Sequence, residues 1–119
     1  MKAIVCHKFA SPGEALVMEE LDNPIPDRGQ VVIEVKAAGI NYVDALMVQG
    51  KYQYAMTPPF VPGTEVSGIV TSTGEGVTDI SIGDRVAADL ISGGFAEQAL
   101  TEAAQCRQLL ADTDFDTIL

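Results

Sequence analysis

Alternation of apolar and polar residues over positions 30–38 constrains the fold of this chain more than any other feature. Val31, Ile33 and Val35 fall on one face of an extended chain, while the other face includes a glutamate and a lysine. Successive side chains of a strand point to opposite faces of a sheet. The segment is therefore predicted to be a strand with one buried and one partly solvated face. Gly39 then allows the chain to turn sharply.

Short segments with strand character also occur before and after this strand, and turn residues such as glycine and proline separate them. They cover residues 2–9, 16–21, 65–73, 85–91 and 95–100. The first two are expected to form a hairpin or a meander around a turn, and Gly93 and Gly94 are expected to link the last two as a hairpin. Some six or seven short strands with one short helix favour a mostly β fold, an antiparallel β-barrel or sandwich.

The short helix is expected directly after the strand over residues 30–38. Asn41 is a favourable N-cap residue, and Asp44 follows three positions later, which is the spacing of a capping box. Apolar residues spaced three and four apart then give the helix one buried face. Gly50 is a typical stop residue, so the helix should be about two turns long.

Charge and hydropathy exclude several classes of function. The 119 residues are enough for one domain with its own core. Seventeen acidic against seven basic residues give a net charge of −10, which repels nucleic acid and anionic lipid surfaces. No apolar run approaches membrane-spanning length, and the amino terminus lacks a signal-peptide pattern. We therefore expect a cytoplasmic protein that binds neither nucleic acid nor membrane.

Cysteine and histidine are too few for a typical metal site. The chain has two cysteines, Cys6 and Cys106, and one histidine, His7. Zinc is usually held by three or four ligands at characteristic spacing, and neighbours on a strand point to opposite faces. We expect two reduced thiols, a histidine with a structural role and no metal. The carboxyl end, residues 111–119, has the acidic residues of a first helical turn, which suggests that the chain is the front part of a longer protein.

Four blocks of sequence carry a resemblance to a known family. They are residues 32–49, 59–70, 83–86 and 93–97. In order and spacing they resemble the amino-terminal, chaperonin-10-like (GroES-like) domain of the medium-chain dehydrogenase/reductase superfamily. The resemblance implies that residues 1–119 form one such domain, a partly open GroES-like β-barrel with one or two short helices.

The resemblance is strongest to the zinc-independent quinone oxidoreductase branch. Zinc alcohol dehydrogenases of the superfamily have a zinc-binding cysteine at the position of Asn41 and a zinc-binding histidine at the position of Thr64, and the four-cysteine structural zinc lobe is also absent here. Members of the zinc-independent branch transfer hydride from NADPH to quinones, enones or related activated double bonds. The resemblance therefore implies NADPH as cofactor, no zinc, and a small quinone or enone as substrate.

The same resemblance implies that a second domain completes the enzyme. Relatives bind the dinucleotide in a Rossmann domain, for which no glycine-rich turn and helix occur before Leu119. They also dimerise through that domain. We therefore expect the complete protein to be a homodimer, and the 119-residue chain alone to be monomeric and inactive.

Asn41 and Tyr52 are the candidate catalytic residues. The Asn41 amide would face nicotinamide and substrate, and could donate a hydrogen bond to a carbonyl oxygen that gains negative charge; the alternative is a plain N-cap role. The Tyr52 hydroxyl could supply a proton or a hydrogen bond, the alternative being packing of its loop. Some relatives have a tyrosine at the position of Leu46, so this chain departs from that pattern.

Other candidates are expected to line the same cleft. Thr64 is expected to contact the nicotinamide ribose or amide, and Tyr42 and Phe95 to line the substrate side, although Phe95 could equally belong to the core. Glu65 is expected to hold a hydrogen-bond network beside the site. A rival hypothesis of another class is a stand-alone GroES-like β-barrel that binds or oligomerises without catalysis. A second rival is a lid that acts with a separate Rossmann chain.

Overall fold

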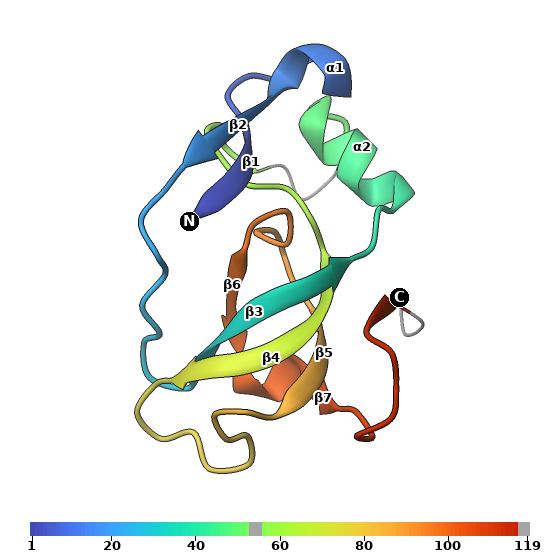
Figure 1. Ribbon diagram of the computed structural model, residues 1–119. Helices are drawn as coiled ribbons and strands as arrows, with labels where there is room; N and C mark the ends of the chain where they lie inside the picture. Colours follow the sequence, from blue (N-terminus) through green and yellow to red (C-terminus); the bar gives the residue numbers. More distant parts are fainter. Residues whose placement is uncertain (53–55, 117–119) are drawn as a thin grey trace.

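The structure, a computed structural model, describes residues 1–52 and 56–116, and Figure 1 shows the arrangement of its helices and strands. The elements in chain order are β1 (Lys2–Cys6), α1 (Pro12–Ala15), β2 (Leu16–Glu20), β3 (Gln30–Ala38), α2 (Tyr42–Val48), β4 (Glu65–Thr73), β5 (Arg85–Asp89), β6 (Gln98–Glu102), the 3-10 turn η1 (Ala103–Gln105) and β7 (Cys106–Gln108). Strands predominate, as the sequence pattern predicts. No helix among these residues is long and apolar enough to cross a membrane.

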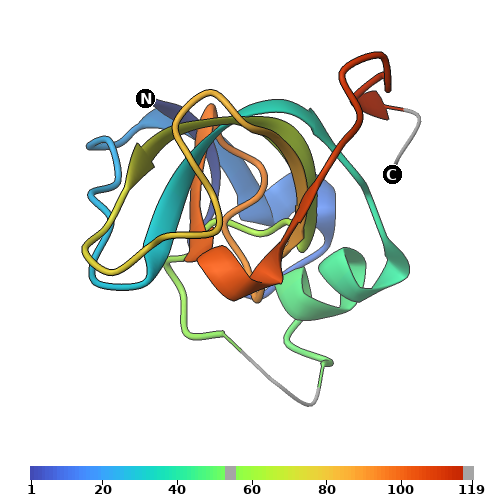
Figure 2. The same cartoon turned by 90° about the horizontal axis from the view of Figure 1, so that it is seen from below.

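Five of the strands form one curved antiparallel sheet in the order β6-β3-β4-β5-β7, and β1 and β2 form a separate antiparallel pair. In Figure 2 the five-stranded sheet curls around its own interior. The edge strands β6 and β7 are not paired with each other, so the barrel is not closed. This arrangement confirms the prediction of a partly open GroES-like β-barrel.

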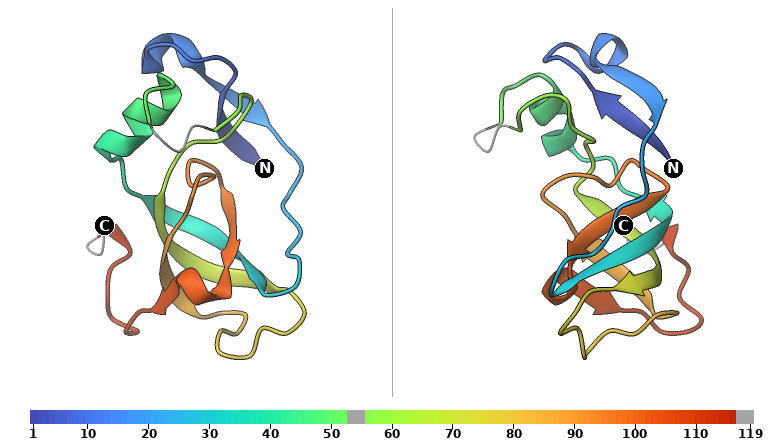
Figure 3. Two further views of the ribbon diagram at one scale, coloured as in Figure 1. Left: turned by 180° about the vertical axis from the view of Figure 1, so that it is seen from behind. Right: turned by 90° about the vertical axis from the view of Figure 1, so that its left-hand side faces the viewer.

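Two separate groups of buried side chains hold the molecule together. The larger group fills the curved sheet and consists of Val31, Ile33, Val66, Val70, Ile80, Val86, Ala88 and Ala99. The smaller group lies under the helices and consists of Cys6, Ala15, Met47, Val48 and Phe60. Figure 3 shows β1, β2, α1 and α2 gathered at one end of the molecule, with the five-stranded sheet at the other. Each fully buried valine or isoleucine contributes about 1.5–3 kcal/mol relative to an exposed one.

Close approach of β3 and β4 depends on a glycine. A Cβ on Gly68 would lie 2.0 Å from the carbonyl oxygen of Glu34, so no side chain fits there. The pairing of the two strands shifts register between Val35 and Ala37, next to this contact. Such irregularities bend a strand and increase its twist, which suits a sheet that must curl into a barrel.

The first predicted hairpin is confirmed and the second is wrong. β1 and β2 pair antiparallel, with the short helix α1 in place of a simple turn. β5 and β6 do not pair: β5 lies between β4 and β7, and β6 lies beside β3. The reason is a set of backbone hydrogen bonds that hold the intervening loop against another segment. Gly93, Gly94 and Phe95 donate to the carbonyl oxygens of Val61, Gly63 and Pro62 at 2.7, 3.0 and 2.9 Å.

Some predicted boundaries also change. The first strand ends at Cys6 rather than residue 9, and the strand at residues 85–91 ends at Asp89. β7 was not predicted at all. Of residues 111–119, where the start of a helix was expected, residues 111, 112 and 115 form turns and Asp116 has 3-10 geometry, while residues 117–119 lie outside the described part of the chain, so this expectation stays untested.

Candidate functional site

The start of α2 is built as the sequence predicts. Asn41 is the N-cap, with extended backbone at φ −119° and ψ 160°, and its N–H donates to Oδ2 of Asp44 at 2.8 Å. The predicted capping box is therefore confirmed. It fixes the Asn41 backbone at the point where β3 gives way to the helix, while the Asn41 residue itself remains exposed.

The capping carboxylate of Asp44 is itself buried. Only 4% of its surface is exposed, and Oδ1 has no hydrogen-bond partner among the described residues. One oxygen of the carboxylate thus caps the helix while the other stays unsatisfied. A buried unpaired polar atom is unfavourable. The cap therefore restrains Asn41 at some expense to stability.

The opposite side of the site depends on the loop before β4. Gly63 has φ +108°, and a Cβ there would lie 2.7 Å from the backbone nitrogen of Phe95. Both the dihedral angle and the close contact require glycine at this position. The loop then delivers Thr64, whose carbonyl oxygen accepts a hydrogen bond from the Leu90 N–H at 2.8 Å. The turn at Gly63 and the pairing with the end of β5 thus place Thr64 at the edge of the barrel.

A cavity of about 520 Å³ lies between α2 and this edge of the barrel. Its lining residues are Val43, Met47, Tyr52, Thr64, Glu65, Asp89, Leu90 and Ile91. One wall comes from α2 and from Tyr52, four residues beyond the end of α2, and the other comes from the start of β4 and the end of β5. The walls are mostly apolar with a few polar groups, which is the usual character of a small-molecule site. The structure thus brings together two predicted site residues, Tyr52 and Thr64.

Asn41, a predicted catalytic residue, is not among the residues that line this cavity, but its side chain lies near that of Glu65, which does line it. A Cβ on Gly39 would lie 2.8 Å from Oε1 of Glu65 and 3.7 Å from Nδ2 of Asn41. The carboxylate and the amide therefore flank the same glycine. Because Gly39 has no side chain, the first residue of β4 can pack against the backbone that precedes α2.

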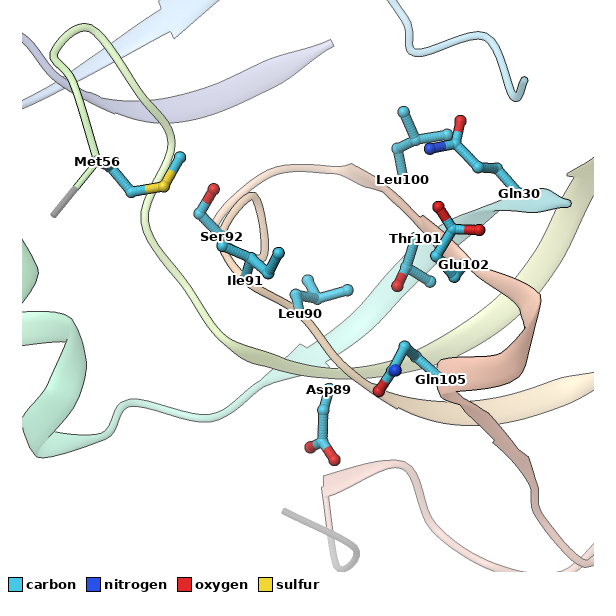
Figure 4. A pocket seen from close by; sticks show the side chains of 10 residues that line it. All are labelled: Gln30, Met56, Asp89, Leu90, Ile91, Ser92, Leu100, Thr101, Glu102 and Gln105. Carbon is cyan, nitrogen blue, oxygen red and sulfur yellow. The ribbon is translucent and has the colours of Figure 1, made fainter. Parts of the chain in front are cut away.

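A second cavity of about 550 Å³ adjoins the first. Its lining comes from the end of β5, from β3, β6 and η1, and from Met56, as Figure 4 shows. Asp89, Leu90 and Ile91 line both cavities. These three residues therefore form the boundary that the two cavities share.

Two predicted lining residues lie elsewhere. Tyr42 is 79% exposed at the start of α2 and does not line the 520 Å³ cavity. Phe95 lines a different cavity of about 370 Å³, next to β1 and Met18. The sequence interpretation also missed Asp89, Leu90 and Ile91. Antiparallel pairing of the strands predicted at residues 65–73 and 85–91 was the available signal, since it would have brought Asp89 opposite Glu65.

The cysteines and the histidine are not part of the cavity. Both cysteines are free: Cys6 is fully buried and Cys106 is half-buried. Burial raises the pKa of both thiols, so neither is an activated nucleophile. His7 Nε2 lies 2.5 Å from Oε1 of Glu19 on the β1–β2 hairpin. Within residues 1–52 and 56–116, no group of three or more histidine, cysteine or acidic residues is placed to hold a metal ion.

Comparison with known proteins decides the family. Residues 27–112 match the alcohol dehydrogenase GroES-like domain. The chain belongs to this family. It is 33% identical over 116 residues to the human quinone oxidoreductase, covering 97% of this chain and 35% of that protein. An alcohol dehydrogenase of Moraxella sp. (strain TAE123) is 43% identical over 86 residues, covering 72% of this chain and 25% of that protein.

Solved structures agree with the sequence matches. The chain superposes on the Escherichia coli quinone oxidoreductase complexed with NADPH with a TM-score of 0.91 and 32% identity, covering 98% of this chain and 35% of that one. These similarities place it in the medium-chain dehydrogenase/reductase superfamily, in the quinone oxidoreductase-like branch, which confirms the resemblance. The chain spans only about a third of the length of these quinone oxidoreductases.

Proposed function

We propose that this chain is the substrate-side domain of a zinc-free, NADPH-dependent oxidoreductase that transfers hydride to a quinone, an enone or a related activated double bond. The observation that carries the proposal is the cavity that joins Tyr52 and Thr64 beside the Asn41 cap. The similarity to quinone oxidoreductases, some of them solved with NADPH, supports the same class of reaction. A Rossmann domain following the chain, a homodimer formed through it and a cytoplasmic location complete the proposal.

The residues present suit the nicotinamide end of the cofactor and not its phosphates. The cavity has apolar walls from Val43, Met47 and Ile91, and the Thr64 hydroxyl is available at its edge for an amide or ribose group. The glycine turn at residues 73–76 does not match the dinucleotide-binding fingerprint, because a third glycine and a following helix pattern are absent. The second domain would therefore hold the pyrophosphate, and NADPH when bound would supply the hydride.

The protein's own residues act by orientation and hydrogen bonding. The apolar walls exclude water and hold the planar acceptor against the cofactor, which is the main requirement of hydride transfer. The Asn41 amide donates to the acceptor carbonyl oxygen as that oxygen gains negative charge. The Tyr52 hydroxyl provides a second donor at the α2 wall. Asparagine and threonine are poor zinc ligands in comparison with cysteine and histidine, and this supports the zinc-free assignment.

The test uses the complete protein, including any sequence that follows Leu119. NADPH oxidation is measured with simple quinones and enones for the natural protein and for Asn41→Ala, Tyr52→Phe and Asn23→Ala. Loss of an oxyanion donor should lower kcat of Asn41→Ala by roughly 10²–10³-fold. Asn23 is an exposed asparagine between β2 and β3, so Asn23→Ala serves as the matched control.

The alternatives give different results in this test. Unchanged kcat in Asn41→Ala would assign Asn41 to the helix cap alone. Absence of NADPH oxidation with every quinone and enone would overturn the enzymatic proposal and favour the stand-alone binding module. Recovery of activity only on addition of a separate dinucleotide-binding chain would support the trans-acting lid.

A further inference from the structure

Two carboxylates face each other across the strands that form one wall of the 520 Å³ cavity. Glu65, the first residue of β4, pairs with Asp89, the last residue of β5. Both side chains line the cavity. Like charges directly opposite each other on antiparallel strands are destabilising. The fold therefore keeps an unfavourable pair at the cavity wall.

Within the described part of the chain, no positive side chain forms an ion pair with Glu65. Asp89 lies 3.3 Å from Nη1 of Arg107, but both side chains of this pair are more than half exposed, at 63% and 58%. Solvent screens such an exposed pair strongly. Glu65 has no ion pair among the described residues, and no lysine or arginine lines the cavity. The β4–β5 wall is therefore negative, with Glu65 as its main charge.

The Glu65 carboxylate lies close to the backbone that precedes α2. Its Oε1 packs against Gly39, where a Cβ would lie only 2.8 Å away. Thr64, next to it in sequence, is the residue expected to contact the nicotinamide amide or ribose. The charge is thus held on the same wall as the expected cofactor contact, and the α2 wall with Met47 and Tyr52 lies opposite.

We propose that Glu65, assisted by Asp89, makes this wall selective for the oxidised, cationic nicotinamide ring over the reduced, neutral ring. This inference rests on the proposed function. The reduced ring becomes a cation with one positive charge when it gives up a hydride, that is, one proton with two electrons. The ribose and phosphate groups carry the same charge in both states, so their repulsion by the acidic protein cancels when the two forms are compared. The carboxylates therefore favour the charge that appears on the donor ring during turnover.

The test compares the dissociation constants of NADP⁺ and NADPH for the complete protein, by calorimetry in low-salt buffer. Glu65→Gln keeps the shape of the side chain and removes its charge. The ratio of the NADP⁺ to the NADPH dissociation constant should rise roughly three- to tenfold, because only the cationic ring loses an attraction. Asp89→Asn should raise the ratio less, since the Asp89 side chain is 63% exposed and solvent screens its charge. Asp22→Asn, which removes an exposed charge outside the cavity, should leave the ratio unchanged.

The outcomes separate this inference from the proposed function. An unchanged ratio in a folded Glu65→Gln protein that still oxidises NADPH with quinones overturns the inference alone. A raised ratio in a protein that reduces no quinone or enone supports the inference and overturns the proposed acceptor. Binding of neither cofactor form by the natural protein overturns both. Should Glu65→Gln fail to fold, Asp89→Asn decides the question, because Asp89 is exposed and its replacement should not disturb folding. The ratio of the NADP⁺ to the NADPH dissociation constant must then be higher in Asp89→Asn than in Asp22→Asn.

Discussion

The guanidinium group of Arg85 lies 4.4 Å above the centre of the Phe115 ring. The same group donates hydrogen bonds to the carbonyl oxygen of Leu110, at 2.6 Å, and to that of Thr113. The buried hydroxyl of Ser67 donates to the carbonyl oxygen of Phe115 at 2.7 Å. One arginine and one serine thus fasten the segment after β7 to strands β4 and β5.

Replacement of Arg85 should release this segment. We expect Arg85→Met to lower the free energy of unfolding by about 1–3 kcal/mol, because two charge-assisted hydrogen bonds and a cation–π contact are lost. Arg28→Met is the control, since Arg28 forms only an exposed ion pair with Glu75, and should change stability by at most about 0.5 kcal/mol. Urea unfolding measures both, and hydrogen exchange at the Thr113 N–H should become faster only in the first. Equal effects of the two substitutions would contradict this role.

Substitution of two glycines that have similar dihedral angles distinguishes the effect of backbone strain from that of a steric clash. Gly63 has φ +108° and Gly93 has φ +100°, but only at Gly63 would a Cβ meet other atoms within 3 Å. Gly93→Ala should cost about 1–2 kcal/mol, the usual expense of placing alanine in this region. Gly63→Ala should cost several times more, because its Cβ would collide with the Phe95 backbone. Thermal unfolding of the two variants gives the comparison, and similar losses would show that the loop can move aside.

The barrel core should tolerate truncation poorly. Ile33 on β3 is fully buried, whereas Ile25 before that strand is 81% exposed. Ile33→Ala should lower the free energy of unfolding by about 2–5 kcal/mol, through lost burial and an unfilled cavity. The same change at Ile25 should stay within about 0.5 kcal/mol. Denaturant titration of both variants tests the difference, and a small effect at Ile33 would mean that the interior repacks.

Stability should decline at alkaline pH because of the thiols. Burial raises the pKa of Cys6 and Cys106 above their ordinary value of 9.0. Above that value an unfolded chain loses thiol protons that the folded chain retains, which lowers the free energy of the unfolded state relative to the folded state. The contribution of the protonated thiols to the free energy of unfolding is fully present below pH 9. It is lost as the pH rises through the pKa values of the thiols in the folded chain. Unfolding measured between pH 8 and pH 10 should therefore show a smaller decline for Cys106→Ala than for the natural chain; an identical pH dependence would argue against it.

Local features of the fold were predictable from the sequence. The bounds of β3 and β4 agree with the segments predicted at residues 30–38 and 65–73, because alternation along one strand does not depend on distant residues. The cap formed by Asn41 and Asp44 was predictable for the same reason, since both residues lie within one helical turn. Both the alternation of apolar and polar residues and the helix cap depend only on residues close together in the sequence.

Features that depend on distant contacts were not predictable in this way. The glycine pair at residues 93–94 resembles a hairpin turn, but its N–H groups bond to the loop at residues 61–63, and the flanking strands join different neighbours. β7 is only three residues long and gains its strand geometry from pairing with β5. Tyr42 illustrates the same limit at the site, because a helix start fixes a residue's position but not the side of the cavity to which its side chain turns.

The division of the molecule into two cores has a consequence for how such proteins diversify. Met47 belongs to the small core under the helices, while Leu90 packs against the large core of the barrel, and both line the 520 Å³ cavity. The cavity therefore lies at a seam between two independently packed units. Substitutions in the small core would alter the residues behind the α2 wall, whereas the buried side chains of the barrel belong to the other core. Under the proposed function, such substitutions would change which acceptor fits the cavity while the strands around Glu65 and Asp89 stay in place.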